Sequence, residues 1–436
     1  MDRRGIFSRA GHSIGDMNVG YRPLEDIGCD DNMHIVCQNR GRGNSVIRVL
    51  MITTRFYPVV GGAEKQAQKL AKKLVEKGLD VKVVTGWWDR KTPRKEMVDG
   101  IPVFRNFTFW GMFGIRGIRK FGTYTYMVTL LLYLLRHRKE YDVIHVHSAT
   151  FPAFVGVIAG KLLSKPTIVK VMTSGEWGDL KRMQENRIMS GTRQMLPVIR
   201  NADCVISLNS QAGRELVEAG FRKDGIAYIP NGVEIDDSKI KASYDLNHQV
   251  TLTFVGRLHP KKGLDILLRA FNKAVQRKPG ISWQLLILGD GSLRSELEAT
   301  ARQLGIWDET RFCGYVDDVF PYLARTDIFV LPSYSEGVSN ALLEAMSCGS
   351  PCIATDIAGN ADVITDGENG LLVRCGEEND LATAIIRLVE KKELRARLGN
   401  EALETVKRSY SIESVTDRYV DLYRQLLQSK SSEVSL

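Results

Sequence analysis

The stretch SEGVSNALLEAMSCG, residues 335–349, combines residue types suited to binding an anion. It follows an apolar run typical of a strand, and Ser339 and Asn340 are good helix N-caps, so a helix is predicted to begin near them. The backbone N–H groups of Gly337, Val338, Ser339 and Asn340 would then be free to bind a phosphate, and glycine would allow its close approach. The turn therefore predicts a phosphate-binding seat.

Two glutamates flank this turn. Glu344 lies about one helical turn inside the predicted helix, and helical side chains lean toward the N-terminus, so its carboxylate can reach the same ligand. A carboxylate repels a phosphate but accepts hydrogen bonds from paired hydroxyls. The pattern indicates a nucleotide sugar, with Glu344 at the ribose and Glu336 at the transferred sugar. A capped surface helix with two solvated acids is the open alternative for this stretch alone.

A second candidate motif is GRLHPKKG, residues 256–263, which places Gly256, Arg257 and Lys262 between a strand and a helical pattern. Two cations in such a turn suit a diphosphate leaving group, because its charge must be neutralised as the glycosidic bond breaks. No Asp-x-Asp sequence, the usual carboxylate pair for a Mg²⁺ or Mn²⁺ diphosphate clamp, occurs in the chain. We therefore expect no metal cofactor. Ordinary solvated loop cations are the alternative.

The first half of the chain contributes weaker signals. Gly61 and Gly62 lie at a strand-to-helix turn in FYPVVGGAEKQ, where backbone amides could approach a phosphate or sugar. The strand ending HVHS puts His145 and His147 on one face, with His147 nearest the carboxyl end. A sugar contact by His147, a buried structural pair and, less favoured, a metal site all remain open.

A further loop, TSGEWGD at residues 173–179, supplies Ser174 and Glu176 after the next strand. Both side chains could hold a hydroxyl of the acceptor or the donor. We therefore predict that this loop lies on the acceptor side of the site.

Short β-branched runs alternate with helical stretches such as AEKQAQKLAKKLVEKG from Val46 onward, which predicts parallel, doubly wound sheets. The strand runs of the first part are VIRVLMITT, DVKVVTG, YDVIHVH, PTIVKVM, DCVISLN and IAYIP. The pattern weakens after Ile229 and restarts with VTLTFVGRL, WQLLILGD, TRFCGYV, IFVLPS, PCIATD and GLLV. We therefore expect two Rossmann-like α/β domains facing across a cleft that binds the ligand. The predicted ranges are a disordered leader or start-site artefact at 1–45, a first domain at 46–230, a linker at 231–249, a second domain at 250–410 and an amphipathic helix at 411–436.

Composition limits the class of protein. The chain has 436 residues, 44% of them apolar, and its apolar runs are shorter than the roughly 20 residues that span a bilayer. Seven scattered cysteines suggest neither disulfides nor a zinc site. Residues 46–230 hold 30 Lys and Arg against 15 Asp and Glu, whereas residues 231–436 hold 24 against 30. We expect a cytoplasmic protein whose first half meets an anionic membrane surface or phosphorylated lipid rather than nucleic acid.

The chain from Val46 to the final helix resembles glycosyltransferase family 4, the glycosyl transferases group 1 of the GT-B fold. The resemblance rests on GGAE, HVH, PNGVE, VGRLHPKKG, LLILGDG, EGVSNALLEAMSCGSP and DGENGLLV in order. It implies that Arg257 and Lys262 bind the donor diphosphate, and that Glu336 and Glu344 contact the sugar and the ribose. It also implies transfer with retention of anomeric configuration, without a metal or a firmly identified protein nucleophile. Ser339 stands where the family often has proline.

Three other functions would fit parts of the sequence. GHSIG at residues 11–15 fits the G-x-S-x-G of an esterase but lies in the aperiodic leader, which lacks the strand and helix that motif needs. GDGSLR lacks the third glycine of a dinucleotide fingerprint, so an NAD enzyme is disfavoured. A nucleotide-sugar epimerase of the same fold remains the alternative.

Residues 106–141 mix aromatics, aliphatics and cations. This composition indicates one of two things. Either the segment lies on anionic lipid, with a polyprenyl-diphosphate sugar or other glycolipid as acceptor, or it is a core helix with basic flanks.

Overall fold

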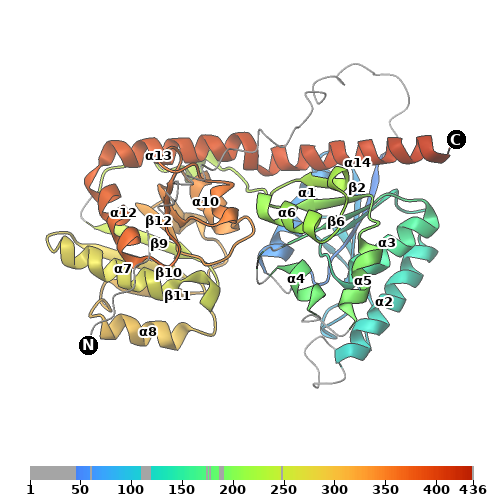
Figure 1. Cartoon of the computed structure of the whole chain (residues 1–436), viewed down its shortest axis with the longest axis horizontal. Coiled ribbons are helices and arrows are strands. Elements are labelled where there is room, and N and C mark those ends of the chain that lie inside the picture. Colours follow the sequence, from blue (N-terminus) through green and yellow to red (C-terminus); the bar gives the residue numbers. More distant parts are fainter. Residues whose placement is uncertain are drawn as a thin grey trace, which may run out of the picture. The chain divides into compact units, whose positions relative to one another are not determined.

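A computed structural model describes residues 46–58, 61–109, 119–172, 175, 178–185, 191–246 and 249–434. These residues form two lobes, each built on one mainly parallel sheet with helices packed against it (Figure 1). The GT-B class of two Rossmann-like sheets that the sequence predicts is confirmed. The leader of residues 1–45, with its GHSIG motif, lies outside the described residues.

The first lobe holds an eight-stranded sheet in the order β3-β4-β2-β1-β5-β6-β7-β8. Its strands are β1 (Arg48–Ile52), β2 (Asp80–Gly86), β3 (Lys95–Val98), β4 (Ile101–Asn106), β5 (Val143–Val146), β6 (Thr167–Lys170), β7 (Cys204–Ser207) and β8 (Ile226–Tyr228). Its helices are α1 (Gly62–Glu76), α2 (Arg119–Arg136), α3 (Phe151–Leu163), α4 (Asp179–Gln184), α5 (Thr192–Ile199) and α6 (Ser210–Glu218).

The hairpin of β3 and β4 is absent from the sequence prediction, which lists only parallel strands for this lobe. Strand β3 is antiparallel to β4, and the two residues joining them, Asp99 and Gly100, have φ angles of 49° and 77°. Positive φ at both central residues is the geometry of a tight hairpin turn, for which Asp-Gly is a preferred sequence. The Asp-Gly turn signal is present in the sequence, but the two strands are short and β3 is largely exposed, so no long apolar run marks them as strands.

The second lobe holds a six-stranded parallel sheet in the order β11-β10-β9-β12-β13-β14, and all six strands match runs predicted from the sequence. Its strands are β9 (Val250–Val255), β10 (Trp283–Leu288), β11 (Thr310–Gly314), β12 (Ile328–Leu331), β13 (Cys352–Thr355) and β14 (Leu371–Val373). Its helices are α7 (Leu264–Arg277), α8 (Arg294–Gln303), α9 (Phe320–Leu323), α10 (Asn340–Ser347), α11 (Ala358–Ala361), α12 (Glu378–Glu390) and α13 (Lys392–Thr405).

Helix α14 (Ile412–Val434), at the red end of the chain in Figure 1, packs against α1 of the first lobe. Its buried face carries Tyr419 and Tyr423, which join the apolar cluster beneath β1 that includes Val49 and Met51. The chain thus returns to the first lobe after completing the second. Among the helices that the structure describes, none combines the length and apolar character that crossing a bilayer requires.

Candidate functional site

The loop after β12 holds the residues that are predicted to form the anion seat. Helix α10 begins at Asn340, and Ser339 is its N-cap, with its Oγ accepting a hydrogen bond from the N–H of Leu342 at 3.4 Å. No hydrogen bond within the described part of the chain uses the N–H of Gly337, Val338, Ser339 or Asn340 as its donor. These N–H groups, with the positive end of the helix dipole behind them, can bind an anion.

The carbonyl groups of this loop are held by the first lobe. Asn209 Nδ2 donates to the carbonyl oxygen of Gly337 at 3.1 Å, and Asn231 Nδ2 donates to that of Val338 at 3.4 Å. Because the C=O and the following N–H of a trans peptide point in opposite directions, fixing these carbonyls also fixes the N–H groups of Val338 and Ser339. The first lobe therefore orients the seat.

Close packing explains the glycine at the start of this seat. A Cβ atom on Gly337 would lie 3.1 Å from the carbonyl oxygen of Met172, which follows β6. On the other side, a Cβ on Gly359 of α11 would lie 1.8 Å from the carbonyl oxygen of Gly337. The loop is thus confined by backbone from both lobes, which limits how far it can shift when a ligand binds.

The predicted cations lie on the loop after β9. Lys262 ends a short 3₁₀ turn, Pro260–Lys262, and Gly263 follows it with a φ of 62°. A Cβ on Gly263 would lie 2.1 Å from the carbonyl oxygen of Pro332, so glycine is needed to bring this loop against the end of β12. The sequence H-P-K-K-G therefore places Lys262 beside the anion seat.

Lys262 and Glu336 are paired with each other. The Nζ of Lys262 lies 2.5 Å from Glu336 Oε1, which also accepts a hydrogen bond from Ser333 Oγ at 2.7 Å, and both side chains are mostly buried. The sequence assigned Lys262 to the diphosphate and Glu336 to the sugar. Their pairing places the group predicted to bind the diphosphate directly beside the group predicted to bind the sugar.

Arg257 is exposed at the start of the same loop. Burial, followed by the charges of Lys261, Arg257 and Lys262, lowers the pKa of His259. The loop thus carries Arg257, Lys261 and Lys262 close to one imidazole, and such a concentration of positive charge suits a diphosphate. Gly256, which precedes Arg257, is held close to the next loop, because a Cβ on Gly289 would lie 1.9 Å from its carbonyl oxygen.

Glu344 faces the first lobe from the first turns of α10. Its side chain is 18% exposed and its carboxylate lies 4.0 Å from the Nζ of Lys69 on α1. Burial raises the pKa of Glu344, while the charges of Lys69 and Lys65 act in the opposite direction. A mostly buried carboxylate with an incomplete set of partners can accept hydrogen bonds from a ligand hydroxyl.

The predicted glycine turn of the first lobe meets the seat directly. Gly61 is the N-cap of α1 and Gly62 is the first residue of that helix. Asn340 Nδ2 donates to the carbonyl oxygen of Gly62 at 3.1 Å, and a Cβ on Gly62 would lie 3.2 Å from the same Nδ2. The N-terminal ends of α1 and α10 are therefore in contact.

His145 in β5 and His147 directly after it lie on the same side of the chain, as predicted, with ring centroids 4.2 Å apart. The Nδ1 of His145 lies 2.8 Å from the hydroxyl of Tyr423, whereas neither ring nitrogen of the buried His147 has a hydrogen-bond partner among the described residues. Burial and the neighbouring charges of His145 and Lys170 lower the pKa of His147 well below its ordinary value. Burial therefore favours the neutral form of His147. The described residues contain no cluster of three His, Cys, Asp or Glu that could hold a metal.

Ser174 and Glu176, the predicted acceptor-side pair, lie outside the described residues. Gly175 between them is described: its N–H donates to Glu215 Oε1 at 2.7 Å, and a Cβ on it would lie 3.9 Å from Ser335 Oγ. The backbone at Gly175 thus lies beside the start of the anion seat.

Several residues of the site were not predicted. They come from four places far apart in the sequence and contact either the seat or the residues that hold it. These residues are Lys69 in α1, Lys170 in β6, Asn209 before α6 and Asn231 after β8. The sequence Pro-Asn-Gly at residues 230–232 is one of the motifs that carry the family resemblance, but the motif by itself does not indicate which group Asn231 contacts.

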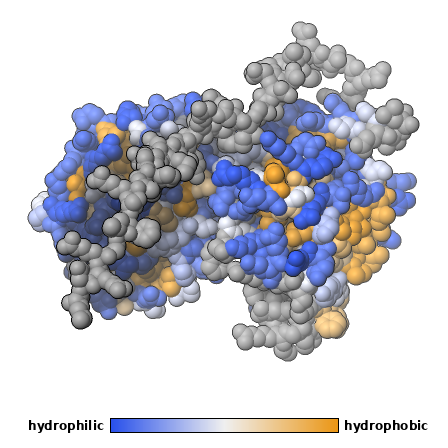
Figure 2. All heavy atoms as spheres, viewed as in Figure 1, coloured by the Kyte–Doolittle hydropathy of each residue, from blue (hydrophilic) through white to orange (hydrophobic). Residues whose placement is uncertain are grey.

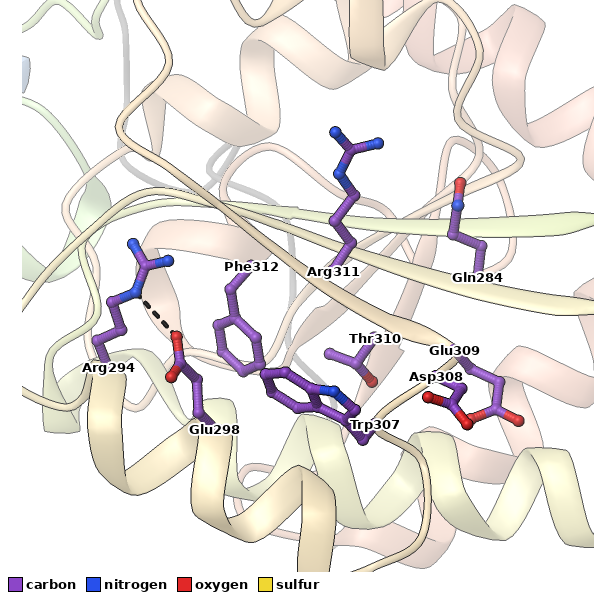
Figure 3. Close-up of a pocket in the computed structure, with 9 residues that line it drawn as sticks. All are labelled: Gln284, Arg294, Glu298, Trp307, Asp308, Glu309, Thr310, Arg311 and Phe312. Carbon is purple, nitrogen blue, oxygen red and sulfur yellow. Dashed lines mark hydrogen bonds and ion pairs between the residues drawn. The ribbon is translucent and has the colours of Figure 1, made fainter.

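A hollow of about 450 Å³ lies elsewhere, at the edge of the second sheet (Figure 3). The residues that line it are Gln284, Arg294, Glu298, Trp307, Asp308, Glu309, Thr310, Arg311 and Phe312. Arg294 and Glu298, joined by the dashed line in Figure 3, pair at 2.9 Å between Nε and Oε1. None of the anion-seat residues lines this hollow, so we do not assign the reaction to it.

Two Rossmann-like lobes, with a glycine-containing loop at the start of α10 and a loop of cations beside it, fit a glycosyltransferase of the GT-B class. The family profile described as Glycosyltransferase Family 4 matches residues 60–237, and that described as Glycosyl transferases group 1 matches residues 249–391. The chain belongs to glycosyltransferase family 4.

Two relatives and one solved structure are similar to this chain. The lipopolysaccharide core biosynthesis glycosyltransferase LpsE of Rhizobium meliloti is 34% identical over 241 residues, 54% of this chain and 67% of that protein. An Escherichia coli UDP-Gal:alpha-D-GlcNAc-diphosphoundecaprenol alpha-1,3-galactosyltransferase is 26% identical over 313 residues, 69% of this chain and 79% of that protein. The crystal structure of Anabaena HepE in complex with UDP has a TM-score of 0.67 at 19% identity, covering 87% of this chain and all of HepE, which shows a shared fold.

Proposed function

We propose that this glycosyltransferase moves a sugar from a nucleotide-diphosphate sugar to a lipid-linked or glycan acceptor, with retention of anomeric configuration, in the synthesis of a cell-surface polysaccharide or glycolipid. The observation that carries the proposal is the set of N–H groups at Gly337, Val338, Ser339 and Asn340, which donate no hydrogen bond to any described residue and follow Glu336, the ion-pair partner of Lys262. Such a site suits a diphosphate, and the UDP bound to HepE supports a nucleotide donor.

The proposed roles follow from the charges that develop during transfer. As the bond between the sugar C1 and the diphosphate oxygen breaks, Arg257, Lys262 and the helix N-terminus stabilise the departing diphosphate. The acceptor hydroxyl attacks C1 from the same face, and its proton passes to the donor phosphate. Glu344 holds the ribose, Glu336 the transferred sugar, and His147 contacts that sugar from the first lobe. No step requires a protein nucleophile or a metal.

A donor panel tests the first half of the proposal. A nucleotide present at 100 times its dissociation constant should stabilise the protein by about 2.7 kcal/mol, so thermal shifts with UDP, GDP, ADP and their sugar conjugates should single out one base. The absence of any shift across the panel would contradict a nucleotide donor. Labelled donor then separates the alternatives, because label in a larger or lipid-soluble product means transfer, whereas a free altered sugar means epimerisation.

The proposal of a lipid-linked acceptor is based on the surface of helix α2. One face of α2 packs Tyr126, Leu130 and Leu134 into the core, as a core helix would. Another face exposes a stripe of large apolar residues, and Figure 2 shows apolar side chains gathered over this side of the molecule. The stripe consists of Phe121 (65% exposed), Tyr124 (45%), Val128 (59%) and Leu132 (61%). We call these four residues the α2 stripe.

An anionic lipid surface is the partner that fits the α2 stripe. The stripe continues into the exposed Arg136 and the following Arg138 and Lys139, and residues 46–230 carry a formal charge of +15. Apolar side chains that enter the lipid interface next to cations are typical of peripheral membrane binding. LpsE and the diphosphoundecaprenol galactosyltransferase support an acceptor carried on a lipid. The protein would then work at the inner face of the membrane.

Vesicle sedimentation tests this surface. We expect the protein to pellet with vesicles containing anionic phospholipid at low salt and to be released at high salt, because the attraction between protein and lipid is screened. Val128→Glu should weaken vesicle binding roughly tenfold, since it removes an apolar contact and adds a repelled charge.

The matched control is Val217→Glu, which makes the same change at a 45%-exposed valine on α6, away from the α2 stripe. This variant should pellet like the unmodified protein. Sedimentation that is independent of salt, or that both glutamate variants reduce equally, would contradict binding through the α2 stripe.

A further inference from the structure

Three side-chain hydrogen bonds form a continuous chain from strand β6 to the N-terminal ends of α10 and α1. Lys170 Nζ donates to Asn231 Oδ1 at 3.2 Å, Asn231 Nδ2 donates to Asn340 Oδ1 at 2.9 Å, and Asn340 Nδ2 donates to the carbonyl oxygen of Gly62 at 3.1 Å. Each group donates to the next in one direction. Lys170 at the start of the chain can only donate and the carbonyl of Gly62 at its end can only accept, so the direction in which both amides point is fixed from the two ends. We call this chain the Lys170 relay.

Lys170 is an unusual residue to find in this position. Its side chain is 2% exposed, and the described residues provide no ion pair for it. The rings of His145 in β5, of His147 directly after β5 and of Tyr419 in α14 lie near it, and none of them carries a negative charge at neutral pH. Burial lowers the pKa of Lys170 to about 7.

A buried lysine without a carboxylate partner is costly for stability. Burial of an uncompensated ammonium is unfavourable, and an apolar side chain of similar length in its place is often neutral or stabilising. Both the ammonium and the neutral amine carry N–H groups, so either form can donate to Asn231. What lysine supplies here, and methionine would not, is a hydrogen-bond donor at the start of the relay.

The relay ends at the elements that form the anion seat. Asn340 is the first residue of α10, and Asn231 also holds the carbonyl oxygen of Val338, so the relay sets the direction of N–H groups in the seat. Its last bond reaches Gly62 at the start of α1. The relay thus locks the seat of the second lobe to the glycine turn of the first.

We propose that Lys170 is a positioning residue for the donor: by orienting Asn231 and, through it, Asn340, it holds the anion-binding N–H groups in register with the first lobe. This inference rests on the proposed function, because it assumes that the donor diphosphate binds at the N-terminus of α10. Lys170 touches neither the donor nor the acceptor in this scheme.

Lys170→Met tests the inference. We expect the Kd for UDP, or for whichever nucleoside diphosphate the unmodified protein binds, to rise roughly tenfold, because the peptide groups of the seat lose their fixed orientation. The KM for the sugar donor should rise by a similar factor and kcat should change less. The melting temperature should stay the same or increase, because an uncompensated buried cation is removed. A purely structural role predicts the opposite, a lower melting temperature with donor affinity unchanged in the protein that remains folded.

Asn340→Ala cuts the relay at its other end and keeps the test usable if Lys170→Met does not fold. It should also raise the Kd for the nucleoside diphosphate roughly tenfold. The double variant should lose little more than either single variant, because both changes break the same chain. Losses that multiply in the double variant would overturn the relay.

Lys241→Met is the matched control. Lys241 is also mostly buried, but it pairs with Asp327 at 3.1 Å and donates to the carbonyl oxygen of Thr326, away from the seat. Its replacement should lower the melting temperature and leave the Kd unchanged. Nucleoside-diphosphate binding by Lys170→Met that equals that of the unmodified protein would overturn the inference. Failure of the unmodified protein to bind any nucleoside diphosphate would instead overturn the proposed donor.

Discussion

Arg257→Ala is expected to lower kcat by about 10²- to 10³-fold while leaving the melting temperature unchanged. Removal of one preorganised group that stabilises developing charge commonly has an effect of this size. Arg257 is exposed on the loop after β9, in the cation cluster that lowers the pKa of His259. Since the side chain is exposed, its loss should act on the reaction and not on folding. Steady-state kinetics with the donor found in the nucleotide panel, alongside a thermal melt, would measure both.

Lys262→Ala should differ from Arg257→Ala in a diagnostic way. It should also reduce kcat, but it leaves the mostly buried Glu336 without its cation, so the melting temperature should fall as well. Arg269→Ala, on the adjacent helix α7 and paired with Asp265 and Glu378, is the control that should change neither kcat nor the melting temperature appreciably.

A chelator provides an independent test of whether protein cations, and not a bound metal, stabilise the departing diphosphate. The proposal assigns to Arg257, Lys262 and the helix N-terminus the charge stabilisation that a bound cation supplies in other transferases. Activity should therefore persist in EDTA. Loss of turnover under chelation, with recovery on addition of manganese, would contradict this assignment, as would full activity of Arg257→Ala.

Glu344→Gln is expected to weaken binding of the nucleotide sugar by roughly 1 to 3 kcal/mol, or about 5- to 150-fold in Kd, because charge-assisted hydrogen bonds to the ribose are lost. The pH dependence supplies a second readout. Burial raises the pKa of Glu344 above 4.5, so its carboxylate becomes protonated at a higher pH than an exposed glutamate would. Donor affinity should fall as the pH drops through that raised pKa, and the glutamine variant should not show this acid limb.

Stability should move in the opposite direction for Glu344→Gln. A carboxyl group whose pKa is raised on folding destabilises the folded protein when the pH lies above both its folded and unfolded pKa, so glutamine should preserve or increase stability at pH 7. Glu298→Gln on α8, next to the hollow of Figure 3, is the control and should leave donor affinity unchanged. Unchanged donor affinity in Glu344→Gln, measured by calorimetry, would contradict the ribose contact.

Local sequence signals predicted much of the fold. All six strands of the second sheet and the N-cap at Ser339 follow from short-range patterns, because a buried strand needs a run of apolar residues and a helix start needs an N-cap. The hairpin of β3 and β4 was missed even though Asp99-Gly100 is a turn signal, because its strands lack the long apolar run that identified the others.

The sequence alone indicated the class of protein and singled out residues 337–340 and the cations Arg257 and Lys262 as candidate site residues, since each motif consists of residues close together in the chain. Only the tertiary structure decided that Lys262 pairs with Glu336, that Lys69 approaches Glu344, and that Lys170, Asn231 and Asn340 form one relay. These contacts join residues 61 to 275 positions apart. Packing of loops within each lobe, and of one lobe on the other, brings such residues together, and no local pattern of residue types specifies which side chains will meet.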